Sequence, residues 1–203
     1  MRILFSLLAA LMLQMVQAQD AVEATLYYDD EKVVVGTEAP AFSGTDLGGA
    51  KVDSEALLES GDLVVVFYRG VWCGYCREHL TALQDSLSYL TEAGVQLVVV
   101  TPEQPTFIQQ VAKETGSTYP IIQDADYSIM SDFGVAYTIT EGSVTKYRSI
   151  VTKKTAKSNG NDDGVLPVPA TFVIGQDGKV KWRHFDPDYS QRSSIAEILK
   201  VVG

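Results

Sequence analysis

Two runs of apolar residues, at 63–67 and 95–100, form the clearest pattern in the chain, and the second contains one polar residue, Gln96. Both are rich in valine and about as long as a strand, and such runs belong to sheets that are covered on both faces. Between them, leucines recur at spacings of three and four residues, which predicts a helix over about 74–93 that packs on the sheet. Strand, helix and strand in this order predict a right-handed parallel crossover. These leucines are Leu80, Leu83, Leu87 and Leu90.

The C-terminal part of the chain predicts a hairpin and a final helix. Strands at 170–174 and 179–184 are joined by Gly-Gln-Asp-Gly, which is a good turn signal. Ser194 and Glu197 have the spacing of a capping box, which predicts a helix over 195–202. The whole pattern indicates an α/β fold. Shorter helices or extended pieces are expected at about 53–59, 103–114, 119–122 and 126–132.

Two stretches lack a clear pattern. Residues 19–35 are interpreted as an N-terminal arm with a weak hairpin signal around an acidic run. Residues 137–166 combine lysines with a run of Ser, Asn, Asp and Gly, which predicts an exposed insertion that carries a strand at 144–151. A solvated loop is the favoured interpretation of this insertion, and a lid over the active site is the alternative.

Charge and the N-terminus limit the partners and the location. The formal net charge of −10 disfavours nucleic acid and anionic membranes as partners, because both need clustered positive charge. Residues 1–18 have the form of a signal peptide, with Arg2, an apolar centre and Ala18 before the cleavage site. We expect secretion across the inner membrane, a periplasmic location and no stable membrane insertion after cleavage. An uncleaved anchor is the alternative.

The chain has two cysteines, Cys73 and Cys76, which follow the first apolar strand after a short link at 68–72. A disulfide between them closes so short a loop that it would stabilise the fold by only roughly 2 kcal/mol, so a redox role is the better explanation. A thiolate at a helix N-terminus is stabilised by the helix dipole, and a second thiol one turn away can resolve a mixed disulfide. Trp72 would cover one side of the sulfurs, and Tyr75 influences their reduction potential. Arg69 either adds positive charge or is a solvated link residue.

Zinc is a competing use of a Cys-x-x-Cys pair. A structural zinc site normally needs a second pair of ligands, and the only histidines are His79 and His184, far apart in the sequence. We therefore expect neither a metal nor another cofactor. His79 is interpreted as a helix-surface residue, with tuning of the thiol as the alternative, and His184 as structural.

The motif WCGYC at 72–76, with VPATF at 168–172, resembles the thioredoxin superfamily. That resemblance implies a thioredoxin-like fold, with a central mixed sheet, flanking helices and a cis proline at Pro169 that faces the cysteines. A trans proline at the start of a strand is the alternative. The segments GTEAPAF at 36–42, FYRG at 67–70 and GQDGKV at 175–180 are similar to the alkyl hydroperoxide reductase/thiol-specific antioxidant family, the peroxiredoxins. The resemblance implies one domain over 36–203, with the 137–166 insertion before the cis-proline strand.

The chain departs from the peroxiredoxin pattern at two positions. The family's peroxidatic cysteine falls on Cys76, its threonine on Cys73, and its arginine on Pro169. Threonine and arginine orient the peroxide in that family, and here both are replaced by residues typical of thioredoxin. The chain thus resembles a peroxiredoxin framework that carries a thioredoxin site.

The leading hypothesis is a secreted, thiol-based antioxidant oxidoreductase that exchanges disulfides with protein or small-molecule substrates. In it Cys73 is the nucleophile, Cys76 the resolving thiol, and Pro169 shapes the substrate groove. The alternative is a thioredoxin-dependent peroxiredoxin that reduces hydroperoxides. Either enzyme needs an external thiol as electron donor. A non-catalytic binding or chaperone-like module is a lesser alternative, and it would keep its function after both cysteines are changed to serine.

Overall fold

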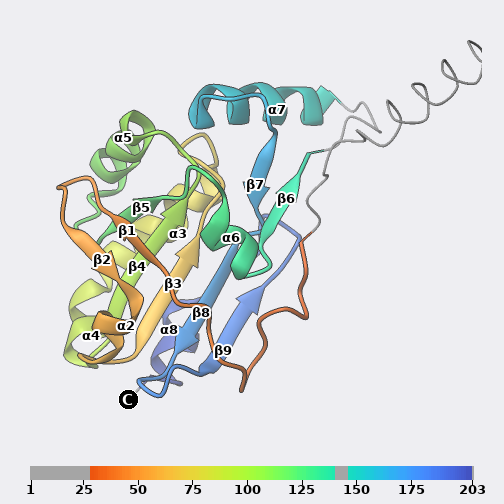
Figure 1. Cartoon of the computed structure of the whole chain (residues 1–203). Helices are drawn as coiled ribbons and strands as arrows, with labels where there is room; N and C mark the ends of the chain where they lie inside the picture. Colours follow the sequence, from red (N-terminus) through yellow and green to blue (C-terminus); the bar gives the residue numbers. More distant parts are fainter. Residues whose placement is uncertain (1–27, 140–145, 203) are drawn as a thin grey trace, which may run out of the picture.

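A five-stranded mixed sheet forms the centre of the protein, in the order β5-β4-β3-β8-β9 (Figure 1). The computed structural model describes residues 28–139 and 146–202. Strands β3, β4 and β5 are parallel, while β8 is antiparallel to both β3 and β9. The two apolar runs form the central strands, as predicted, and the predicted C-terminal hairpin is confirmed. The strands are β3 (Leu63–Phe67), β4 (Gln96–Thr101), β5 (Ile121–Gln123), β8 (Ala170–Ile174) and β9 (Val180–Phe185).

One face of the sheet is covered by four of the helices. The predicted helix over 74–93 is two helices, because Ser86 has non-helical backbone angles (φ −107°, ψ 6°). The next helix begins with a proline in its first turn and ends at Gly116, whose positive φ only glycine adopts readily. The capping box of the last helix is confirmed. The helices are α3 (Gly74–Asp85), α4 (Leu87–Glu92), α5 (Pro105–Thr115) and α8 (Ile195–Leu199).

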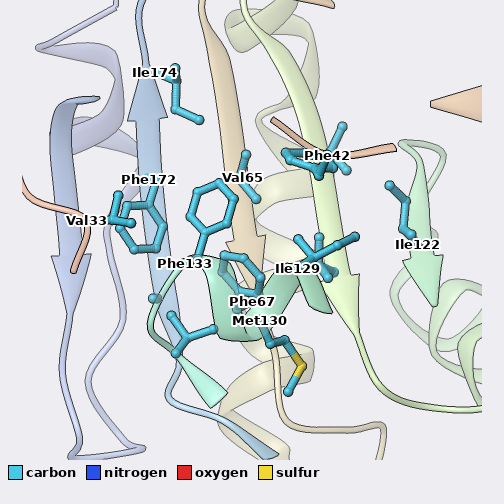
Figure 2. Close-up of a cluster of buried hydrophobic side chains, with 14 of the residues drawn as sticks. Val33, Phe42, Val65, Phe67, Ile122, Ile129, Met130, Phe133, Phe172 and Ile174 are labelled. Carbon is cyan, nitrogen blue, oxygen red and sulfur yellow. The ribbon is translucent and has the colours of Figure 1, made fainter. Parts of the chain in front are cut away.

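Smaller elements cover the opposite face, where Figure 2 shows the hydrophobic cluster. Alternate residues of β3 point to opposite faces, so Val65 and Phe67 belong to this cluster and Val64 to the other. The ring of Phe133 lies 5.2 Å from that of Phe67 and 5.1 Å from that of Phe172. The covering elements are β1 (Ser43–Thr45), β2 (Lys51–Asp53), α2 (Ser54–Leu58, capped by Asp53) and α6 (Ser128–Asp132).

The segment expected to be an exposed insertion contains a helix, α7 (Lys146–Asn159), which follows β6 (Ala136–Thr138) and precedes β7 (Val165–Pro167) (Figure 1). From residue 146 on, the expected strand at 144–151 and the expected solvated loop are both wrong, because this part of the chain is helical. Val151, Thr155, Ser158 and Asn159 are buried at helical spacing. Three of these four side chains are polar, so a search for apolar periodicity does not find this face.

The N-terminal part of the described chain, residues 28–35, runs as turns and not as the expected hairpin. The expected signal peptide lies outside the described residues, as does most of the arm. Within the described parts of the chain, no helix is long and apolar enough to cross a membrane.

Candidate active site

Both cysteines lie where β3 passes into α3. Cys73 is the N-cap residue of α3, with extended backbone angles, and Cys76 lies in the first turn. Both are free thiols, and their relative exposures are 5% and 1%. Cys73 lines a cavity of about 340 Å³, whereas Cys76 does not. A substrate that enters this cavity therefore meets Cys73 first.

The pKa values of the two thiols are shifted in opposite directions. A hydrogen bond from the Cys76 thiol lowers the pKa of Cys73 to about 6, and the guanidinium groups of Arg69 and Arg192 act in the same direction. Burial raises the pKa of Cys76, and its hydrogen bond to Cys73 raises it further. At neutral pH the pair therefore consists of a Cys73 thiolate and a Cys76 thiol. This difference identifies Cys73 as the attacking sulfur, because the thiolate is the nucleophile.

Arg192 is a site residue that the sequence analysis missed. Its Nη2 lies 3.3 Å from Cys76 Sγ and 3.8 Å from Cys73 Sγ. Its Nη1 donates to the carbonyl oxygens of Tyr189 and Gln191 at 2.5 and 2.6 Å, which fixes the guanidinium beside the sulfurs. The residue follows the cysteine motif by more than a hundred positions in a polar stretch, and no pattern in that stretch indicates a role.

Arg69 is buried, so the interpretation as a solvated link residue is wrong. Its guanidinium carbon lies 5.1 Å from the ring centroid of Trp72 and 4.6 Å from that of Tyr189, so its charge is held between two aromatic faces. Tyr75 is 47% exposed, and its ring meets that of Tyr189 edge-on at 6.0 Å. The structure thus brings Arg69, Trp72 and Tyr75 together at the mouth of the cavity with Cys73.

Glu103 is a second site residue without a predicted role. It was expected only as the start of a helix, but it precedes α5 and is fully buried. Both of its carboxylate oxygens accept the backbone N–H of Val71, at 3.0 and 2.9 Å, so it holds the link that leads to Cys73. Burial raises its pKa to about 7. The signal in the sequence was an acidic residue shortly after an apolar strand, separated from β4 by Pro102.

His79 is buried, which corrects the expectation of a surface residue. Its Nε2 lies 3.1 Å from Ser193 Oγ, which in turn lies 2.9 Å from Thr171 Oγ1. Burial lowers the pKa of His79 to about 4, so the ring is neutral at physiological pH. His79 therefore ties α3 to the residue next to Arg192. His184 lies in β9, where its ring stacks on Trp182 at 6.5 Å.

The expectation of a cis proline at Pro169 is wrong, because the described residues contain no cis peptide bond. The backbone before Pro169 is extended and hydrogen-bonded, with the N–H of Val168 donating to the carbonyl of Val135 at 2.8 Å. The trans form is also the intrinsic preference of the bond. Ala170 pairs with Phe67, which places Pro169 at the end of β3 that leads to the cysteines. Pro169 is buried and does not line the cavity.

The chain is similar to known thiol-based proteins. Residues 35–183 match the model of the AhpC/TSA family. Thiol-disulfide oxidoreductase ResA of Bacillus thuringiensis is 26% identical over 184 residues, covering 88% of this chain and 85% of that protein. A putative peroxiredoxin of Mycobacterium tuberculosis is 28% identical over 149 residues, covering 73% of this chain and 83% of that protein.

Solved structures show the same fold. Peroxidoxin BcpB of Mycobacterium tuberculosis superposes with a TM-score of 0.62 at 20% identity, covering 83% of this chain and 94% of that chain. A putative protein disulfide isomerase of Bacteroides thetaiotaomicron superposes with a TM-score of 0.57 at 20% identity, covering 87% and 90% of the two chains. The expected thioredoxin-like fold, with its central mixed sheet and flanking helices, is confirmed.

Proposed function

Because the chain belongs to the AhpC/TSA family, we propose that it is a thiol–disulfide oxidoreductase that cycles a disulfide between Cys73 and Cys76. The relatives are thiol-disulfide oxidoreductases and peroxiredoxins, so the reaction class is that of a thiol-based oxidoreductase or peroxidase. The observation that carries the choice between these two is the pairing of an acidic Cys73 in the cavity with a buried, protonated Cys76.

The exchange follows from this pairing. The Cys73 thiolate attacks one sulfur of the substrate disulfide, and the other sulfur leaves as a thiolate that takes up a proton. The resulting mixed disulfide removes the negative charge from Cys73. Cys76 then loses its proton and attacks Cys73 Sγ, which expels the second substrate thiol and forms the Cys73–Cys76 disulfide. The Arg192 guanidinium, 3.3 Å from Cys76 Sγ, favours the second thiolate as it forms. An external dithiol returns the enzyme to its reduced state.

A trapping experiment tests the order of the two sulfurs. In Cys76→Ser, a mixed disulfide at Cys73 should accumulate, and intact-mass and peptide mass spectrometry would locate the adduct. Cys73→Ser leaves only the buried, protonated thiol, and we expect it to form little adduct under the same conditions. A stable adduct at Cys76 in Cys73→Ser, with none at Cys73 in Cys76→Ser, would overturn the proposed roles.

Peroxide reduction is the second candidate, and Arg192 is the observation that favours it. A guanidinium beside the sulfurs can stabilise the charge that develops on a peroxide oxygen, even though the family's arginine position is occupied by Pro169. In that reaction the Cys73 thiolate would attack one peroxide oxygen and become a sulfenic acid as the O–O bond breaks, and the other oxygen would leave as an alkoxide that takes up a proton. Cys76 would then condense with it and release water.

Stopped-flow tryptophan fluorescence separates the two reactions, because Trp72 lines the same cavity as Cys73. Reduced protein is mixed with a hydroperoxide in one experiment and with a disulfide in another. We expect fast oxidation by the disulfide and slow oxidation by the peroxide. Peroxide oxidation far faster than that of a free thiol would instead support the peroxidase.

We also propose that residues 1–18 are a cleaved signal peptide and that residues 36–203 function as one domain in the periplasm. The basis is Arg2, the apolar stretch after it and Ala18, together with the use of both cysteines as a redox pair. The intact mass of the protein from the periplasmic fraction of its host should correspond to a chain that begins at residue 19.

A further inference from the structure

We infer that the preferred substrate is a small disulfide that carries carboxylate groups close to its sulfurs. This inference rests on the proposed function and adds the size and the charge of the substrate. Two independent features of the molecule carry it. One is the enclosure of Cys73 in a cavity that α7 helps to line, and the other is the excess of cations over carboxylates in that lining.

The enclosure limits the size of the substrate. Cys73 is only 5% exposed, and the cavity that leads to it has a volume of about 340 Å³, which is within the range of small-molecule sites. Helix α7 forms one wall through Ile150 and Val151, while Trp72 and Tyr189 belong to the rest of the lining. A flexible small disulfide can enter a space of this kind. A disulfide on the flat surface of a folded protein would have to enter this cavity to reach a sulfur that is only 5% exposed.

The charged residues that line the cavity select for an anion. Arg69 and Lys154 line the cavity, and the opposing carboxylate there is Glu78. Lys154 also lines a neighbouring cavity of about 380 Å³, which contains Arg77, Lys157 and Glu114. Lys154 thus stands between the two cavities, with its Nζ 6.0 Å from the ring of Trp72. In both cavities the cations outnumber the carboxylates.

The composition of α7 strengthens this point. The helix has five basic residues and no acidic residue, in a chain with a formal net charge of −10. Solubility alone does not require a basic helix over the reactive thiol of an acidic protein. A local positive field raises the concentration of an anionic substrate at the site, and it lowers that of a cationic one.

The reaction with such a substrate is balanced without another oxidant. The Cys73 thiolate attacks one sulfur of the disulfide, and the other half leaves as a carboxylate-bearing thiol after protonation. Attack by Cys76 on Cys73 Sγ releases the second half in the same form. One disulfide is reduced to two thiols while the two cysteines are oxidised to one disulfide, and both steps run in either direction.

Three disulfides of similar size and different charge test the inference. They are 3,3′-dithiodipropionate, a dianion, 2-hydroxyethyl disulfide, which is neutral, and cystamine, a dication. The second-order rate constant for oxidation of the reduced protein is measured at pH 7 and low ionic strength, relative to that of a small free thiol. We expect the dianion to react fastest and the dication slowest, with the spread reduced by salt.

Substitutions in α7 test whether Lys154 causes the preference for the dianion. In Lys154→Gln the ratio of the dianion rate to the neutral rate should fall about threefold, which is the size expected for one partly exposed ion pair. Lys153→Gln is the matched control, because Lys153 is an exposed neighbour on α7 that lines neither of these cavities. It removes the same charge from the helix, and it should retain the ratio of the unmodified protein.

The possible outcomes separate this inference from the proposed function. If all three disulfides react no faster than with the free thiol, the proposed function itself fails. If all react fast but without the order of charge, or if Lys153→Gln lowers the ratio as much as Lys154→Gln, the inference fails and the function stands. Faster reduction of a disulfide in a folded protein than of the dianion would overturn the size limit.

Discussion

Replacing Cys76 by alanine removes the hydrogen-bond donor that contributes most to the acidity of Cys73. A hydrogen bond to a charged group contributes about 1.5–3 kcal/mol, and one pKa unit corresponds to about 1.4 kcal/mol. The pKa of Cys73, about 6 in the unmodified protein, should therefore rise by about one to two units in Cys76→Ala. At pH 7 the thiolate fraction should then fall from about 90% to between about 10% and 50%.

The assay is the rate of alkylation by iodoacetamide as a function of pH, together with thiolate absorbance at 240 nm. The variant has one thiol, so its titration curve belongs to Cys73 alone. In the unmodified protein, peptide mass spectrometry shows which sulfur is alkylated. The midpoint of the curve is the relevant quantity, because the plateau rate also rises as a thiolate becomes more basic.

Cys76→Ser is the control, since its hydroxyl still donates a hydrogen bond to the thiolate. Its midpoint should lie near that of the unmodified protein and below that of Cys76→Ala. The reasoning is refuted if the alanine variant keeps a midpoint near 6, or if serine shifts the midpoint as far as alanine does. In the first case the two arginines, and not the second thiol, would account for the acidity. In the second case the serine hydroxyl would not replace the hydrogen bond of the Cys76 thiol.

Three further predictions concern the groups around the site and the core. Glu103 has a pKa of about 7 in the fold against an ordinary value of 4.5, so its contribution to stability is present below pH 4.5 and is lost as the pH rises through 7. In urea titrations, the free energy of unfolding of Glu103→Gln should rise relative to that of the unmodified protein by up to about 3 kcal/mol between pH 4 and pH 8. A difference in free energy that does not change with pH contradicts the raised pKa. Gly70→Ala should lower the thermal midpoint and alter tryptophan fluorescence, because the new Cβ would collide with Trp72 Nε1 and lie 2.9 Å from Glu103 Oε1. Gly74→Ala is the control, since its Cβ meets nothing within 4 Å, and it should change neither the midpoint nor the fluorescence. Equal effects of the two substitutions would count against this packing. Phe133→Ala should reduce the free energy of unfolding by about 3–5 kcal/mol in urea titrations, since this ring fills the space between two others in the core, and a loss below about 1 kcal/mol would mean that the cluster is not close-packed.

The parts of the fold that the sequence predicted are those set by local pattern. The run at 63–67 is apolar at every position, so only a strand covered on both faces suits it, and β3 is buried throughout. The hairpin and the capping box depend on turn and cap residues a few positions apart. The pair Cys73 and Cys76 was recognisable because its spacing is that of one helical turn.

The parts that the sequence did not predict depend on contacts between distant segments. The inner face of α7 uses Thr155 and Ser158 where an ordinary amphipathic helix has leucine, so its burial becomes visible only with its neighbours in place. Arg192 acts through its position beside Cys76 in space, and the residues that flank Arg192 in the sequence do not indicate that position. The cis peptide at Pro169 was carried over from a family, and the backbone before this proline is extended instead.

The separation between Cys76 and Arg192 has a consequence for synthesis. Cys73 and Cys76 leave the ribosome 119 and 116 residues before the arginine that lies beside them in the fold. During that interval the thiols lack one of the charges that favour their thiolate forms. The site therefore reaches its full reactivity only after the C-terminal hairpin and the segment behind it have docked, so a chain that is still being made is less exposed to premature oxidation than the finished enzyme.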